Sequence, residues 1–328
     1  MPTVLASRRL VRAKSIGAAA SFALIARGVT RSFRVHSVFD STLNLDLKGA
    51  DILIALTGPR GSAYPHAISL ERDANFREWR ICPGDGGVIS DWALRIPARE
   101  LVIDLSRART SAVSVLAAVS DLGDAFHACE TQLARHQTRK VCDLNISFLY
   151  EQACAGSPVS AALCRGAVEF GLAVVDFNSR TDAGKRATPE LPHDAESHLR
   201  SAAARLVGCG GGLTPAGDDF LCGFLAALRS SPVPDGNGPR GGLDITLCDA
   251  IEQNIGSTGE VSASLLRCAM RSYWPRPLAD LSAALAVEDG FAALRALDEL
   301  CGLGHSSGAD IATGFLYGLR LLARENDR

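Results

Sequence analysis

The chain has 328 residues, a length that suits one large domain or two ordinary ones. Apolar residues make up 47% of it and charged residues 21%, as is normal for a folded globular protein. The formal net charge of -2 leaves no broad basic field, so the composition argues against nucleic acid as a partner.

The N-terminus is basic, with no acidic residue before Asp40. Arg8 and Arg9 precede an apolar stretch at 16–26, a pattern that an export signal or a transit peptide could also show. The stretch is too short to span a bilayer and has no clear small-residue cleavage site, so we interpret it as a first core helix. The ten cysteines form no CxxC pair and several lie in apolar patterns, which predicts buried free thiols, no zinc site and a cytoplasmic protein.

The N-terminal half has the pattern of strands. Apolar runs at 51–57 and 101–105 predict buried strands, and residues 67–70 could pair with the first of them. Gly/Pro clusters at 58–62 and 82–87 predict turns, since neither has the Lys-Ser/Thr ending of a phosphate-binding loop. From about Ser111 the pattern becomes helical, with a Pro/Gly-rich loop at 230–242.

We therefore predict an α+β protein. A strand-rich domain with an initial helix is expected over residues 1–150, and a largely helical domain that carries the functional site over residues 151–328.

The C-terminal half contains an internal repeat. Residues 214–229 align without a gap on residues 305–320 and agree at seven positions, where composition alone gives about one or two. The identical positions are Gly217, Asp219, Gly223, Phe224, Leu225, Leu228 and Arg229 in the first copy, and Gly308, Asp310, Gly314, Phe315, Leu316, Leu319 and Arg320 in the second. In each copy a Gly-rich polar loop leads into an Asp and then an amphipathic helix.

Glycine inside a helix lowers its stability by about 1 kcal/mol relative to alanine, so we expect Gly223 and Gly314 to have a packing or functional role. Small residues let two helix backbones approach closely, and we predict that the two repeated helices cross at these glycines. Their starts would then form one site, with Asp219 and Asp310 close together and facing one pocket.

Helix starts and Gly-rich loops attract small anions through free N–H groups. The residues expected to bind an anion or substrate are Thr214, Gly217, Asp218, Ser257, Thr258, Ser306, Ser307 and Gly308. The acidic residues Asp218, Asp219 and Asp310 would either cap helices and orient nearby donors, or hold Mg²⁺ that in turn holds the anion. No cofactor is firmly predicted, and Mg²⁺ is the one candidate.

A hydroxyl-rich segment at 254–264 precedes an apolar run and predicts a loop followed by a helix start. Its hydroxyls either donate to an oxyanion or cap the local backbone. Beyond these segments we find no GxSxG, HExxH or Walker A motif.

These segments carry a family resemblance. Residues 212–223, Gly-Leu-Thr-Pro-Ala-Gly-Asp-Asp-Phe-Leu-Cys-Gly, resemble the signature of the AllH-type family, which is associated with the third subunit of oxamate carbamoyltransferase. Residues 304–310 resemble the family's second Gly/Ser-rich block, 35–45 its N-terminal block and 257–266 its middle block. Ala216, where Ser is expected, and the pair Gly259-Glu260 depart from the pattern.

The resemblance implies a step of allantoin catabolism in which oxalurate and phosphate give oxamate and carbamoyl phosphate, within a complex that has two further subunits. The expected catalytic residues are His305, Asp219 and Asp310. Backbone N–H groups near Gly217 and Gly308 would stabilise the oxyanion, and His305 would protonate the leaving nitrogen.

A cation to neutralise the phosphate would come from Arg205, Arg267 or Lys185. Two other functions stay open at this point: a non-catalytic scaffold subunit of the same complex, and a Mg²⁺-dependent small-molecule hydrolase that uses the Asp pair. The expected partners are other subunits and a small anionic substrate, with no nucleic acid and no membrane.

Overall fold

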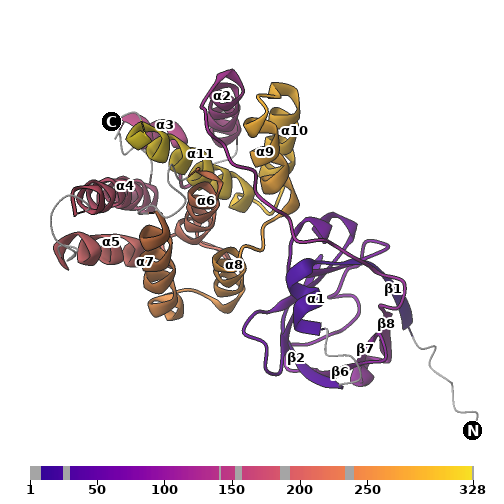
Figure 1. The fold of residues 1–328 in the computed structure, drawn as a ribbon. Coiled ribbons are helices and arrows are strands. Elements are labelled where there is room, and N and C mark those ends of the chain that lie inside the picture. Colours follow the sequence, from indigo (N-terminus) through magenta and orange to yellow (C-terminus); the bar gives the residue numbers. More distant parts are fainter. Residues whose placement is uncertain are drawn as a thin grey trace, which may run out of the picture. The chain divides into compact units, whose positions relative to one another are not determined.

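The structure is a computed structural model that describes residues 9–24, 30–139, 142–151, 157–184, 193–232 and 240–326. The chain forms two compact units, one of strands and one of helices (Figure 1), so the predicted α+β class is confirmed. The first unit comprises Met1–Ser114 with Tyr273–Arg276, and the second Val115–Ser272 with Pro277–Arg328. The units thus divide after Ser114, whereas we placed the domain boundary near residue 150.

The first unit is a sheet closed into a ring. Its strand order is β5-β4-β3-β2-β6-β7-β8-β1, and β5 pairs with β1 to close it, while β9 pairs with the end of β1. The strands are β1 Arg9–Ile16, β2 Arg31–Val38, β3 Thr42–Leu47, β4 Ile54–Thr57, β5 Ala67–Leu70, β6 Gly86–Ser90, β7 Ala93–Ile96, β8 Leu101–Asp104 and β9 Arg109–Thr110. Closure satisfies backbone groups that an open sheet would leave at its edges.

The predicted strands at 51–57, 67–70 and 101–105 correspond to β4, β5 and β8, and β5 pairs with β4 as anticipated. The pairing is parallel, an orientation that was not predicted. The apolar stretch at 16–26 begins at Ile16, the last residue of β1, and contains helix α1, Ala18–Leu24. Residues 25 and 26 lie outside the described ones. Strand β1 was not predicted, because its basic residues also fit a targeting signal. In β1 they point away from the buried side chains of Ala13 and Ile16.

The second unit consists of helices, with α6 and α11 at its centre. The helices are α2 Asp124–Arg139, α3 Ile146–Glu151, α4 Pro158–Gly184, α5 His193–Leu206, α6 Ala216–Ser230, α7 Arg240–Gln253, α8 Glu260–Met270, α9 Arg276–Ala286, α10 Gly290–Cys301 and α11 Ser307–Asn326. Every residue of α6 except Arg229 is buried.

The helical pattern was expected from about Ser111, and this was wrong. Residues 111–123 have no regular secondary structure, and α2 begins at Asp124. The segment is held by single bonds to distant elements: the Ala117 N–H donates to the Ser282 hydroxyl at 3.1 Å and the Val119 N–H to the Ser230 carbonyl at 2.7 Å. Such long-range partners leave no local signal in the sequence.

Helix α4 contains a stretch, Pro158–Arg180, that is long and apolar enough to cross a membrane by length and composition alone. A core helix passes the same test, and α4 buries one stripe that includes Leu163, Phe170 and Phe177. The Phe170 ring packs edge-on against Phe224 of α6, with 4.8 Å between centroids. Core packing therefore accounts for this apolar stripe.

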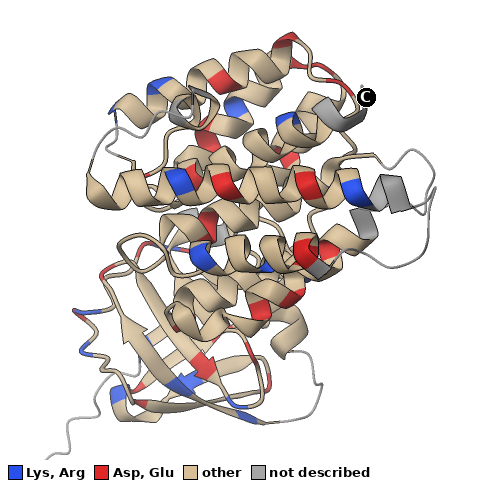
Figure 2. Cartoon of the chain, turned by 90° about the vertical axis from the view of Figure 1, so that its left-hand side faces the viewer, with Lys and Arg blue, Asp and Glu red and all other residues tan. Residues whose placement is uncertain are grey.

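Acidic and basic residues are interspersed along the helices in the view of Figure 2. Nine of the ten cysteines are described, and all nine are free thiols. Cys154 lies outside the described residues.

Candidate functional site

Helices α6 and α11 pack backbone against backbone. A Cβ atom on Gly223 would overlap the Ile311 carbonyl oxygen and lie 2.8 Å from the backbone nitrogen of Phe315. One on Gly314 would overlap the Phe220 carbonyl oxygen and lie 2.8 Å from its carbonyl carbon. Real Cβ atoms essentially never come closer than 3.0 Å to such neighbours, so the close crossing predicted at the two glycines is confirmed.

The two helices run parallel, so their starts lie at the same end. The hydroxyls of Thr214 and Ser307, just before α6 and at the first residue of α11, are 2.7 Å apart. At the other end of the crossing, a Cβ atom on Gly318 would lie 2.6 Å from the Cβ atom of Ala227. The contacts advance in the same direction along both chains, and the positive ends of both helix dipoles therefore meet.

The repeated glycines at the helix starts have a packing role. A Cβ atom on Gly217 would overlap the carbonyl oxygen of Leu206, the last residue of α5. One on Gly308 would overlap the carbonyl oxygen of Leu300 near the end of α10. Each copy of the repeat thus seats a helix start directly on the end of the preceding helix.

The backbone N–H groups of these glycines are already bonded. Gly217 donates to the Cys209 carbonyl at 2.9 Å, and Gly308 donates to the Leu303 carbonyl at 3.1 Å. The expectation that these N–H groups stabilise an oxyanion is therefore corrected, since in this structure they are engaged with the loops that precede them.

Asp218 ties three segments together. Its carboxylate accepts the Gly208 N–H at 2.7 Å, the Thr258 hydroxyl at 2.5 Å and the Ser262 hydroxyl at 2.6 Å. The side chain is 1% exposed. Of the roles weighed for Asp218, this geometry supports orientation of the loops, because three donors occupy a carboxylate that a substrate or metal would need.

Asp219 and Asp310 differ from Asp218, because they are buried without a well-aligned hydrogen-bond donor. They are 1% and 0% exposed, and the hydroxyls of Thr214, Ser306 and Ser307 beside them form no well-aligned hydrogen bond to any of the four carboxylate oxygens. A buried charge without partners is costly, so such groups take up protons instead.

Burial raises the pKa of both carboxyls. The pKa of Asp219 lies well above its usual range through burial and through the nearby Asp310 charge, partly offset by the hydroxyls of Ser307 and Thr214. Burial raises the pKa of Asp310 to about 8, partly offset by the Ser306 hydroxyl, with a further rise from Asp143. The two carboxyls thus lie within electrostatic reach of each other, and Asp310 can hold or release a proton near neutral pH.

The remaining candidates surround this pair at different depths. Ser306 and Ser307 are half-buried beside it, while His305 and Ser257 are exposed on their loops. Thr258 turns towards Asp218, as described above. The structure therefore groups Thr214, Ser306 and Ser307 with the Asp pair.

Among the cations considered for phosphate, Arg205 pairs with Glu169 at 3.1 Å and Arg267 with Glu252 at 3.2 Å. Lys185 lies outside the described residues. Asp143, which acts on Asp310 from the segment before α3, was missed, since nothing in its sequence surroundings marks it.

Within the described residues, no three His, Cys, Asp or Glu side chains form a group that could hold a metal ion. Asp218, with its carboxylate engaged by three donors, does not complete a magnesium site with Asp219 and Asp310. The donor set present does not fit the Mg²⁺ ion considered from the sequence.

Comparison with known families covers both units. Residues 206–319 match the family model described as oxamate carbamoyltransferase subunit AllH, and residues 12–110 match the AllH family N-terminal domain. The starts of α6 and α11 fall inside the first match, and most of the closed sheet falls inside the second. These matches identify the class of protein as a subunit of a carbamoyltransferase. The matches together cover most of the chain, which belongs to the AllH family, as its sequence resemblance implied. No solved structure was found to match it.

Proposed function

We propose that this chain takes part in transferring a carbamoyl group from oxalurate to phosphate, and that the paired starts of α6 and α11 are its working site. The observation that supports the proposal is the pair of buried carboxyls, without well-aligned donors, at the meeting point of two helix starts. At this point the chain, a member of a family of carbamoyltransferase subunits, combines the positive ends of two helix dipoles with a titratable carboxyl.

The reaction needs one proton to change place. A phosphate oxygen attacks the carbamoyl carbon of oxalurate, a C–O bond forms, and the bond from that carbon to the oxamate nitrogen breaks. The proton released from hydrogen phosphate goes to that nitrogen, so oxamate and carbamoyl phosphate account for all atoms. A group that titrates near neutral pH speeds such a transfer, typically by 10²–10⁴-fold.

Asp310 and His305 are the proposed proton carriers. The pKa of Asp310, about 8, lets it hold a proton at neutral pH and return it after transfer. His305 is exposed four residues after Cys301, at the end of α10, where a bound anion can reach it. Asp219, whose pKa is raised by burial and by the nearby Asp310 charge, supports Asp310, while the two helix dipoles favour the anionic phosphate and the oxalurate carboxylate.

Partner subunits are part of the proposal, because both carboxyls are sealed from solvent in the isolated chain. We expect the complex to bring its small anionic substrates to this end of the helices, in the cytoplasm as a step of allantoin catabolism. The alternative of a scaffold subunit that only shapes a partner's site rests on the same burial. The Mg²⁺-dependent hydrolase gains no support, since no group of three possible metal ligands assembles among the residues that the structure describes.

Reconstitution tests the proposal. Carbamoyl phosphate formation is measured for the chain alone, for the partner subunits alone and for the complex, with wild-type chain, His305→Gln or Asp310→Asn. We expect turnover only in the complex and a loss on the order of 10²-fold or more for each variant. His198→Gln, an exposed histidine on α5, is the matched control and should keep full activity.

The outcomes separate catalysis from scaffolding. Complexes that assemble with either variant but lose turnover support a role in proton transfer. Near-normal activity of both variants would remove the helix starts from the chemistry and favour the scaffold. Complex assembly is followed by size-exclusion chromatography, so that a folding defect is not mistaken for lost chemistry.

A further inference from the structure

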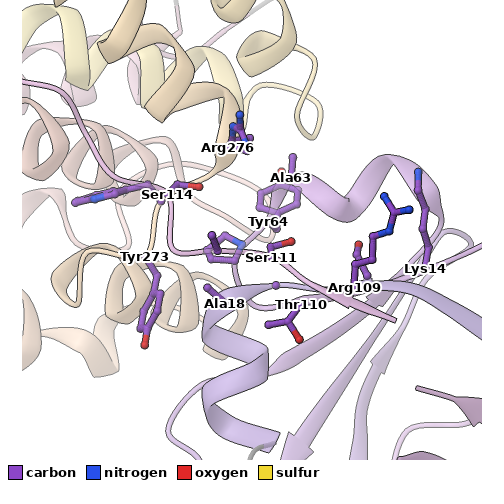
Figure 3. A pocket seen from close by; sticks show the side chains of 15 residues that line it. Lys14, Ala18, Ala63, Tyr64, Arg109, Thr110, Ser111, Ser114, Tyr273 and Arg276 are labelled. Carbon is purple, nitrogen blue, oxygen red and sulfur yellow. The ribbon is translucent and has the colours of Figure 1, made fainter. Parts of the chain in front are cut away.

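A cavity lies in the strand unit, and none of its lining residues belongs to the helix starts. Its volume is about 330 Å³, within the range of small-molecule pockets. Figure 3 shows the residues that line it, which come from β1, the loop before β5, β9 with the residues that follow it, and the segment 273–276. All of them belong to the first compact unit.

The lining of this cavity is cationic. Lys14, Arg109 and Arg276 contribute positive charge, and no Asp or Glu is among the lining residues. Lys14 and Arg109 make no ion pair with any described residue. Hydroxyl groups of Ser15, Thr110 and others complete the wall.

Two of the lining cations come from paired strands, and Lys14 lies where the register of β1 against β5 shifts between Ala13 and Ser15. β1 and β9 pair in parallel with Ser15 opposite Arg109, so Lys14 and Arg109 stand on adjacent strands one residue apart in register. Figure 3 shows both side chains at the wall of the cavity. Because both cations line one cavity, an anion bound there would be attracted by positive charge from two strands.

We propose that this cavity binds the phosphate group of a small molecule. A lysine ammonium and an arginine guanidinium with hydroxyl donors beside them match the three acceptor oxygens of a phosphate dianion, and guanidinium binds two of these at once. The wall also carries Tyr64 and Trp274, aromatic surface that suits the organic part of a phosphorylated compound. This site is separate from the helix starts and does not depend on the reaction proposed for them.

The test uses Trp274 as a local reporter. The chain has three tryptophans, and replacing Trp79 and Trp92 by Phe leaves the fluorescence of Trp274, which lines the cavity and is 4% exposed. Titration with inorganic phosphate at constant ionic strength should give a saturable change in emission. Lys14→Gln and Arg109→Gln should each weaken binding about 10-fold or more, because a charged hydrogen bond is lost.

Matched controls remove the same charges elsewhere on the unit. Lys48→Gln and Arg107→Gln change exposed residues outside the cavity lining and should leave the titration unchanged. Equal loss in the controls would show a general charge effect and overturn the proposal, as would the absence of a saturable change. Acetate that matches phosphate in affinity would overturn the assignment to phosphate. Calorimetric titration of the wild type and Lys14→Gln repeats the comparison without tryptophan replacements.

Two further arms identify the ligand's source and isolate the site. Tighter binding of glycerol phosphate than of inorganic phosphate assigns the cavity to a phosphorylated organic molecule, and the reverse order to free phosphate. Asp310→Asn and His305→Gln should not alter the Trp274 titration. Failure at the helix starts therefore leaves this result standing.

Discussion

Gly314→Ala tests the helix crossing on which the candidate site depends. Alanine is the better helix former, so propensity alone would raise the free energy of unfolding by about 1 kcal/mol. The added Cβ atom, however, would overlap the Phe220 carbonyl oxygen and stand 2.8 Å from the carbonyl carbon, inside the 3.0 Å limit of real contacts. These are backbone atoms of a buried helix, which cannot turn away as a flexible side chain would.

The two helices must therefore separate, and overpacking of this kind costs about 1–3 kcal/mol. With rigid backbone on both sides we take the upper end, about 3 kcal/mol, and subtract the propensity gain of about 1 kcal/mol. A net loss of about 2 kcal/mol remains, which would lower the Tm of a unit of this size by about 4–8 °C.

Gly242→Ala is the matched control. Gly242 lies in α7, and a Cβ atom there meets nothing within 4 Å, so the same substitution should stabilise by up to about 1 kcal/mol. Urea denaturation followed by circular dichroism at 222 nm compares the two. The reasoning fails if Gly314→Ala stabilises the protein as Gly242→Ala does, because the backbones would then not be in contact.

Three further predictions concern stability and thiols. A carboxyl whose pKa is raised on folding stabilises the fold while it is protonated. Asp310 therefore contributes fully to the free energy of unfolding below about pH 4, and this contribution is lost as the pH rises to its folded pKa of about 8. Between pH 5 and pH 8, urea titrations should show a smaller loss of unfolding free energy for Asp310→Asn than for wild type, and equal losses would contradict the raised pKa. Asp218→Ala leaves three donors unpaired and should destabilise by roughly 3 kcal/mol or more, whereas a loss under about 1 kcal/mol would mean that water replaces the carboxylate. Thiol titration of the freshly purified, denatured chain without reductant should recover all ten cysteines, and loss in pairs would argue against a reducing compartment.

The features that were predictable from sequence are those with a local steric signal. Gly223 and Gly314 sit inside helical patterns at a cost that only a close approach explains, and the approach is present. The pairing of β4 with β5 followed from two apolar runs beside a Gly/Pro turn. In both cases the cause lies in the residues themselves.

The role of the glycine N–H groups was not predictable, because the path of the loops decides it. A helix start exposes its first N–H groups only if nothing upstream folds back onto them. Here Gly208, Gly210 and Gly304 adopt φ values of 75°, 124° and 63°, which turn both loops so that their carbonyls cap the helices. Sequence shows glycines in these loops but not which carbonyl each turn delivers.

The repeat distinguishes the structural Asp218 from Asp219 and Asp310, the pair proposed to take part in the reaction. Asp218 is fully bonded, and the second copy has Ala309 in its place, so its role belongs to the first copy alone. Asp219 and Asp310 occur in both copies, yet no described residue forms a well-aligned hydrogen bond to either carboxyl. A buried carboxyl whose oxygens lack well-aligned donors costs free energy that an alanine would not, so apolar packing alone does not explain an acid at both positions. The cost is explained if the pair holds a proton for chemistry at the helix starts.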